Sequence, residues 1–174
     1  KATIARLDQS IPELGYTGSG AVFSTYKVVA EPAVYKSGSL SPAFASASPA
    51  FNQFTTMGDG LTDLGHVIRN LSGKTALIIF TDGDSNMGSD AVAAAKALYD
   101  GNSGKLCIHV VSYADTPTGE QTIAAIRAIS GCSVAADAAG LADDAALAQF
   151  AKDVLYEDAP VVAKPAPIVE KVVI

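Results

Sequence analysis

Two long blocks of apolar residues stand out along the chain. Residues 75–81 read T-A-L-I-I-F-T, and residues 106–113 read L-C-I-H-V-V-S-Y. Runs with so few polar interruptions are typical of strands that are covered on both faces of a sheet. Shorter segments rich in β-branched and aromatic residues predict further strands at 21–29, 33–35 and 132–134.

Between these strands, apolar residues recur at helical spacing. The periodicity predicts helices over 1–11, from Thr62 to Leu71, and over 90–99, 121–129 and 143–156, with a short one around Phe44. Strands that alternate with helices of about ten residues form βαβ units. The predicted fold class is therefore α/β, a doubly wound and mostly parallel sheet with helices on both faces.

Length and composition fit one acidic domain. The 174 residues are 49% hydrophobic and 17% charged, which is enough apolar material for one core. Twelve Lys and Arg against 18 Asp and Glu give a net charge of −6, so nucleic acid is not an expected partner. The apolar stretches are shorter than the ~20 residues of a membrane-spanning helix, so no transmembrane segment is expected.

An oxygen-rich loop follows the first apolar strand. Residues 81–86 read T-D-G-D-S-N, and ligands of open parallel sheets bind at the carboxyl ends of the strands. Carboxylates, hydroxyls and an amide suit Mg²⁺ or Ca²⁺, but a polar turn that caps the next helix has the same composition. A helical calcium loop is disfavoured because Met87 stands at the glycine position and Ala93 at the glutamate position.

No pair of residues in the sequence forms a candidate nucleophile and base. The histidines are His66, on a predicted helix, and His109, within a buried strand, and structural roles are expected for both. Residues 73–75 resemble the end of a phosphate-binding loop but precede a strand instead of following one. An enzyme is therefore not expected. A Mg²⁺-dependent hydrolase would need Asp82 and Asp84 as metal ligands and a further nucleophile.

The strand at 75–81, its continuation Asp82-Gly83, and Gly60-Leu61-Thr62 next to a helix resemble the von Willebrand factor A (VWA) domain over residues 1–156. The metal-ion-dependent adhesion site of that family takes a DxSxS motif after the first strand, a Thr from a G-x-T loop and an Asp from the T-D-G loop. The resemblance implies Thr62 and Asp82 as ligands of Mg²⁺ or another divalent cation, with Asp84 as a further candidate.

One element of the VWA pattern is missing. Residues 8–12 read D-Q-S-I-P, which does not continue as DxSxS, and residues 1–11 resemble the helix that follows the first strand. The family's sheet order, 3-2-1-4-5-6, would then lack its central strand and leave two apolar strand edges open. We expect such a strand, ending in a DxSxS-like motif, before Lys1, or a substitute such as residues 168–174 in its place. Two protein oxygens alone would bind a divalent cation weakly.

The same resemblance places the strand of Cys107 next to that of Cys132. An even cysteine count favours a disulfide, which would close a loop of about 25 residues and stabilise the fold by roughly 3 kcal/mol. Two buried free thiols are the alternative. A disulfide would imply an oxidising compartment.

The resemblance also implies the organisation of the chain. Residues 1–157 are expected to form an N-terminally truncated VWA-like domain, 158–167 a Pro-rich linker, and 168–174 the start of a following domain. This order is similar to bacterial outer-membrane proteins in which VWA precedes an OmpA-like peptidoglycan-binding domain. It implies a periplasmic or outer-membrane-associated, non-catalytic module that binds a protein partner, with peptidoglycan bound by the following domain. The alternative is a structural scaffold or spacer with a vestigial metal site.

Overall fold

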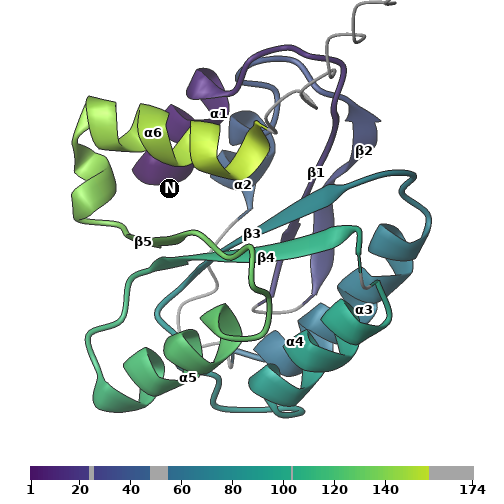
Figure 1. Ribbon diagram of the computed structural model, residues 1–174, viewed down its shortest axis with the longest axis vertical. Coiled ribbons are helices and arrows are strands. Elements are labelled where there is room, and N and C mark those ends of the chain that lie inside the picture. The colour runs from purple at the N-terminus through teal and green to yellow at the C-terminus, as the bar shows by residue number, and fades with distance from the viewer. Residues whose placement is uncertain (24–25, 48–54, 103, 157–174) are drawn as a thin grey trace, which may run out of the picture.

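The computed structural model describes residues 1–23, 26–47, 55–102 and 104–156 (Figure 1). The predicted alternation of strands and helices is present in these segments. In chain order the elements are α1 (Ala2–Ser10), β1 (Thr17–Val22), β2 (Lys27–Val34), α2 (Ser41–Ser46), α3 (Met57–Arg69), β3 (Thr75–Thr81), α4 (Ala91–Asp100), β4 (Leu106–Ser112), α5 (Pro117–Arg127), β5 (Ala135–Asp137), the 3₁₀ turn η1 (Gly140–Ala142) and α6 (Asp144–Leu155).

The strands of the described residues form two sheets. β3, β4 and β5 are parallel, in the order β3-β4-β5, and β1 pairs with β2 in an antiparallel hairpin. Helices α3, α4 and α5 lie on one side of β3 and β4, and α1, α2 and α6 lie on the other (Figure 1). The α/β class with helices on both faces is confirmed. Within the described residues β1 and β3 do not pair, which agrees with the expectation of a sheet that lacks its first central strand in this chain.

Each face of β4 contributes to a different hydrophobic core. Ile108 and Val110 belong to the larger core with α3, α4 and α5, and both are fully buried. Val111 belongs to the smaller core, where Leu7 of α1 and Phe150 of α6 cover the other face. The strand is therefore buried on both sides, as its uninterrupted apolar sequence predicts.

Three helices begin at side chains that cap them. Asp90, Thr116 and Asp143 accept hydrogen bonds from backbone N–H groups of α4, α5 and α6, at 2.6, 3.0 and 2.8 Å. Such caps satisfy N–H groups that the first helical turn leaves free. They place the starts of α4 and α6 within one residue of the predicted positions. α5 begins earlier than residue 121, because Thr116 caps it and proline suits its first turn.

The prediction of one strand over 21–29 is wrong. The chain turns between Val22 and Lys27, so this segment contributes to both strands of the hairpin. β1 begins at Thr17, within the glycine-rich stretch of residues 15–20. A side chain at Gly18 would lie 3.0 Å from the Tyr35 ring, and one at Gly20 would lie 2.7 Å from the Phe44 ring. The glycines therefore make room for aromatic packing.

Two further boundaries differ from the prediction. α3 begins at Met57 and not at Thr62, and residues 132–134 are not a strand. The short β5 comes directly after them, because the N–H of Val134 donates to the ring of His109, at 3.1 Å, instead of to a strand. The predicted linker (158–167) and following strand (168–174) lie outside the described residues. None of the helices in the described segments is long and apolar enough to cross a membrane.

Candidate functional site: the carboxyl edge of the parallel sheet

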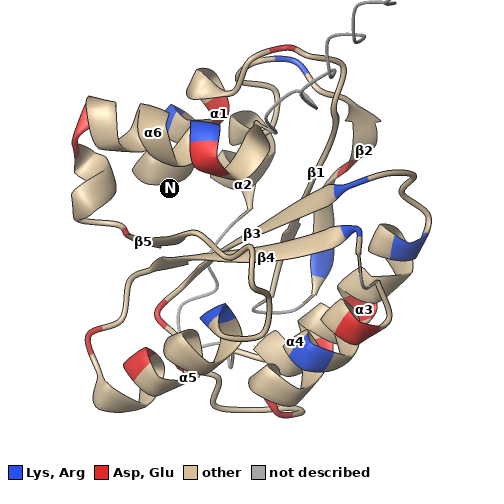
Figure 2. Ribbon diagram, viewed as in Figure 1, with Lys and Arg blue, Asp and Glu red and all other residues tan. Residues whose placement is uncertain are grey.

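Three polar segments meet where β3 and β4 end. They are residues 55–56 before α3, residues 82–90 after β3, and residues 113–116 after β4, and together we call them the carboxyl edge. Ligands of parallel α/β sheets bind at this end of the strands. In Figure 2, acidic residues mark the loops at this end and basic residues mark the opposite end, where β3 and β4 begin.

The loop after β3 holds Asp82 at the surface. The Asp82 carboxylate accepts the N–H of Asp84 at 3.1 Å, which closes a tight turn. Gly83 has a φ of +83°, and a side chain there would collide with the carbonyl oxygen of Gly119 at the start of α5. The two loops are therefore packed backbone against backbone, and only glycine fits at both positions.

Asp84 is held by the neighbouring loop. Its two carboxylate oxygens lie 3.0 and 3.1 Å from the hydroxyl of Thr116, which donates to them and also caps α5. Asp84 is half-buried, whereas Asp82 is exposed. The pair of aspartates predicted from sequence therefore divides into one carboxylate that joins two loops and one that faces solvent.

Thr62 does not lie in a loop. It occupies the second turn of α3, where its hydroxyl donates to the carbonyl of Gly58 at 3.0 Å. Gly60 and Leu61, which precede it in the G-x-T sequence, are buried residues of the same helix. A side chain at Gly60 would collide with Phe23, so this glycine serves packing of the helix.

Two threonines before α3 that were not predicted from the sequence make contacts here: Thr55 meets the loop after β3, and Thr56 meets the residue after β1. The N–H of Thr55 donates to the side chain of Asn86 at 2.9 Å, and its carbonyl accepts the Ser85 hydroxyl at 3.3 Å. The hydroxyl of Thr56 donates to the carbonyl of Phe23 at 3.1 Å. The available sequence signal was a pair of threonines directly before a helix, which is typical of a helix start.

Asp59 joins α3 to the end of the same loop. Its carboxylate accepts both the hydroxyl of Ser89, at 2.6 Å, and the N–H of Ser89, at 3.0 Å. These hydrogen bonds, the hydroxyl first, lower the pKa of the Asp59 carboxyl. The carboxylate is therefore ionised at neutral pH and keeps the loop close to the helix.

Several solved structures share this arrangement of strands and helices. BatB from Bacteroides thetaiotaomicron superposes with a TM-score of 0.65 at 16% identity, over 88% of this chain and 83% of BatB. An aerotolerance-related membrane protein from Bacteroides fragilis gives 0.64 at 17% identity, over 88% and 83%. A manganese-loaded TRAP protein from Plasmodium vivax gives 0.58 at 15%, over 82% and 63%. The chain has a VWA-like fold.

At these identities the likeness shows the fold alone. The sequence itself matches no family model and no curated protein. Within the VWA-like fold, the strand at 75–81 with its Asp-Gly turn lies where the sequence analysis placed it.

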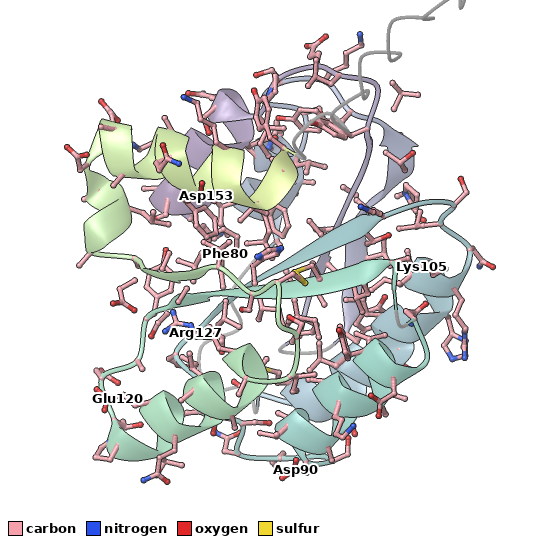
Figure 3. All side chains as sticks on the ribbon, viewed as in Figure 1. Phe80, Asp90, Lys105, Glu120, Arg127 and Asp153 are labelled. Carbon is pink, nitrogen blue, oxygen red and sulfur yellow. A yellow bond between two sulfur atoms is a disulfide. The ribbon has the colours of Figure 1, made fainter. Side chains whose placement is uncertain are left out.

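The disulfide implied by the VWA resemblance is present. Cys107 of β4 is bonded to Cys132, with an S–S distance of 2.10 Å and a Cα–Cα distance of 5.9 Å (Figure 3). It joins the covered strand to the segment that leads into β5. The alternative of two free thiols is excluded.

Both histidines have structural surroundings. His109 is 2% exposed, and burial lowers its pKa to about 4. Its Nδ1 accepts the N–H of Val134, so the ring is neutral and holds the strand-like segment before β5. His66 is exposed on α3, with Nδ1 2.6 Å from the Arg69 guanidinium. Neither ring is placed beside a hydroxyl or thiol nucleophile by the hydrogen bonds of the described residues.

Proposed function

We propose that this VWA-like domain is a non-catalytic protein-binding module of a bacterial cell-envelope protein, and that its partner contacts the carboxyl edge. The observation that carries the proposal is the pair of exposed apolar side chains on this edge. Met87 is 48% exposed and Tyr113 is 42% exposed, on the loops after β3 and β4. Exposed methionine and tyrosine beside polar groups are typical of protein interfaces.

The charge of this edge supports selective binding. Residues 55–68, 82–95 and 113–126 contain no Lys or Arg; they form the edge and those parts of α3, α4 and α5 that precede Arg69, Lys96 and Arg127. Their acidic residues are Asp59, Asp63, Asp82, Asp84, Asp90, Asp115 and Glu120. A single sign of charge steers the approach of a partner and excludes partners that carry the same sign.

The shape of the edge favours a protein over a small substrate. The hollow beside residues 85–92 and Thr122 has a volume of about 240 Å³. Pockets for small molecules are typically about 300–1,000 Å³ and enclose most of the ligand. Together with the lack of a nucleophile–base pair in the sequence, this supports a binding function and not catalysis.

The described residues do not form a closed divalent-cation site by themselves. Asp82 is exposed, but the hydroxyl of Thr62 donates to Gly58 and the carboxylate of Asp84 accepts from Thr116. No group of three or more His, Cys, Asp or Glu in these segments is placed to hold a metal ion. We therefore propose that Mg²⁺ or another divalent cation binds this chain weakly and through Asp82. The manganese-loaded TRAP structure motivates the measurement.

The envelope location is proposed from two observations. One structural neighbour is an aerotolerance-related membrane protein, and a disulfide such as that of this chain is typical of an oxidising compartment. These support a periplasmic or outer-membrane-associated position. Peptidoglycan binding by an OmpA-like domain after residue 168 belongs to the same proposal and rests on the sequence resemblance.

Site-specific crosslinking tests the binding edge. A photoreactive amino acid is placed at Met87 or Tyr113, and at Tyr156, which is 49% exposed at the end of α6, as the control position. In bacterial cells that carry the protein in the periplasm, we expect one crosslinked partner from the edge positions and none from Tyr156. Asp82→Ala should weaken the edge crosslinks, whereas Asp153→Ala, an exposed aspartate of α6, should not. Equal crosslinking at all three positions would contradict the proposal.

A scaffold or spacer with a vestigial metal site is the second candidate. The engagement of Asp84 by Thr116 favours it, because that carboxylate already has a structural partner. Calorimetric titration with Mg²⁺ and Mn²⁺ distinguishes the two candidates. Heat that disappears in Asp82→Ala and persists in Asp153→Ala supports a cation site, and no heat together with no crosslinked partner supports the scaffold.

A further inference from the structure

The Cys107–Cys132 bond, which lies beside β4 in Figure 3, can be approached from one side. Cys132 is exposed, whereas Cys107 is half-buried in β4. A side chain at Gly131 would meet no group within 4 Å beyond its chain neighbours, so the turn before Cys132 is open. An incoming thiol therefore reaches the sulfur of Cys132 more easily than that of Cys107.

The sheet face around the bond is also open. Alternate residues of a strand point to opposite faces, so Cys107 shares its face with His109 and Val111. α1 and α6 cover this face at Val111, which is fully buried. Ala76 of β3, which lies opposite Cys107, is exposed. The disulfide therefore lies where the face is open to solvent, at the start of the two strands. Exposed disulfides exchange with thiols more readily than buried, structural ones.

Non-covalent contacts hold the two cysteines together on either side of the bond. Two residues before Cys132, the hydroxyl of Ser130 accepts the N–H of Ile108 and donates to its carbonyl oxygen, both at 3.3 Å. Two residues after Cys132, the N–H of Val134 donates to Nδ1 of His109 at 3.1 Å. Cys132 is thus held at two positions against β4, the strand of its bonded partner.

The pairing of β4 with β5 adds further contacts. β5 pairs with residues 110–112 of β4. Arg127 reinforces this pairing, because its Nη2 donates to the carbonyl oxygens of Val110 and Ala136, at 2.9 and 2.6 Å. None of these contacts depends on the sulfur–sulfur bond, so they persist when it opens and keep the two thiols adjacent. Thiols held in this way have a high effective concentration and re-form their bond readily.

We propose that Cys107 and Cys132 are a redox-active pair that exchanges two electrons reversibly with a protein dithiol of the Cys-x-x-Cys class, through attack at Cys132. This reaction is separate from partner binding at the carboxyl edge. The chain contains no other cysteine, so no other sulfur competes. The attacked sulfur is the exposed one, and the leaving sulfur is the one that β4 holds in place.

The exchange balances in two steps. One thiolate of the partner attacks Sγ of Cys132 and forms a mixed disulfide, while the Cys107–Cys132 bond breaks and Sγ of Cys107 leaves with the electron pair and takes up a proton. The partner's second thiolate then attacks the partner sulfur of the mixed disulfide, and Cys132 leaves and is protonated. The partner's dithiol is oxidised to a disulfide and the disulfide of this chain is reduced to two thiols. The reverse reaction with an oxidised partner restores the bond.

Trapping of the mixed disulfide tests the site of attack. The probe is a thioredoxin in which serine replaces the second cysteine of the Cys-x-x-Cys motif, so that the second step cannot occur. With the folded, oxidised 174-residue chain it should form a one-to-one adduct. Peptide mass spectrometry should find at least ~10-fold more adduct on Cys132 than on Cys107. Adduct that forms only in urea, or mainly on Cys107, would overturn the proposal.

Equilibration with glutathione redox buffers tests whether the thiols stay adjacent. The reduced chain should remain folded by circular dichroism and should reoxidise at a rate independent of its concentration. Ser130→Ala should lower the effective concentration of the pair by ~3–10-fold, because it removes both hydrogen bonds to Ile108. The matched control is Ser133→Ala, which should leave it unchanged, because the Ser133 hydroxyl has no hydrogen-bond partner among the described residues.

The contrary outcomes are distinct. A reduced chain that unfolds, or that forms disulfides between chains faster than within one, overturns the reversible pair. Equal effective concentrations in Ser130→Ala and Ser133→Ala overturn the role given to the Ser130 contacts. Trapping uses the unaltered chain, so it decides the proposal even if Ser130→Ala does not fold.

Discussion

β3 and β4 have almost the same kind of sequence and very different surroundings. Both are seven-residue apolar strands, and they pair along their whole length, from Thr75 with Leu106 to Thr81 with Ser112. Yet five residues of β4 are buried, whereas Ile79 alone is buried in β3. Among the strands that the structure describes, β4 has a neighbour on each side and β3 has a neighbour on one side.

This difference shows that an apolar strand sequence does not by itself set how deeply the strand is buried. β3 is composed like an interior strand, yet its side chains are less completely covered than those of β4. Helices cover the faces of both strands, so the contrast comes from the edges. Each of the following experiments changes a residue or a contact of β3 or of β4, and compares the effects.

The largest expected effect is on β4. Ile108→Ala should lower the free energy of unfolding by about 4 kcal/mol, because the fully buried side chain leaves a cavity between helices. Ile78→Ala removes the same groups from β3, where the side chain is half-buried, and should cost about 1–2 kcal/mol. Urea unfolding followed by circular dichroism measures both. Equal losses would mean that β3 is as deeply buried as β4 in solution, and would contradict the difference in burial between the two strands.

The next effect concerns the connection that β4 has and β3 lacks. Opening the Cys107–Cys132 bond, which closes a loop with a separation of 25 residues, should cost about 3 kcal/mol. Thermal unfolding with and without reductant measures the loss. The double variant Cys107→Ser, Cys132→Ser should be insensitive to reductant. A chain whose midpoint does not change on reduction would show that β5 is held to β4 by hydrogen bonds alone.

The sequence predicts those parts of the fold that depend on local chemistry. β3, α4, β4 and α6 lie within one residue of their predicted bounds, because long apolar runs and capping aspartates act locally. The hairpin of β1 and β2 was misplaced, as strands at 21–29 and 33–35, because Gly18 and Gly20 have low strand propensity. Their role is to accept the Tyr35 and Phe44 rings, which come from later segments. Such tertiary packing is not visible in a local pattern.

At the candidate site, too, the sequence predicts the positions of some residues but not their contacts. Asp82 is exposed at the carboxyl edge as expected, since it follows an easily recognised buried strand. Asp84 bonds to Thr116, 32 residues away in sequence, and no local pattern predicts this partner. Thr62 was selected by a three-residue motif that fits equally well inside a helix. Its role as a metal ligand, with that of Asp82, stays a prediction for the calorimetric titration.

The pKa of His109 depends on how completely β4 is buried. Burial lowers its pKa to about 4, below the usual value near 6.5, so the unfolded chain binds the proton more readily. The stability that neutral His109 contributes is fully present above about pH 6.5 and is lost as the pH falls toward 4. Between pH 7.5 and pH 4.5 the free energy of unfolding should fall by about 2 kcal/mol more in the native chain than in His109→Gln.

Urea unfolding at several pH values measures this difference. His66→Gln, a histidine replacement at an exposed position of α3, is the matched control. If His109→Gln has the same pH dependence as the native chain, water reaches this face of β4. The contrast in burial between the two strands would then be smaller than the structure shows.

The smallest expected effect lies where the two strands end. Thr116→Val removes the hydroxyl that caps α5 and donates to Asp84, and should cost about 1–2 kcal/mol in urea unfolding. Thr122→Val, in the same helix, removes only a hydroxyl that donates to Thr118 and should cost about 0.5 kcal/mol or less. The loop after β3 should also lose amide protection at Asp84 and Ser85 in Thr116→Val alone. Because β4 is the only strand that pairs with β3 in the described part of the chain, we expect the loop after β3 to depend on this contact from the β4 side. Unchanged protection in that loop would show that the Asp82 turn and the contact of Gly83 with Gly119 hold it without the Thr116 hydroxyl.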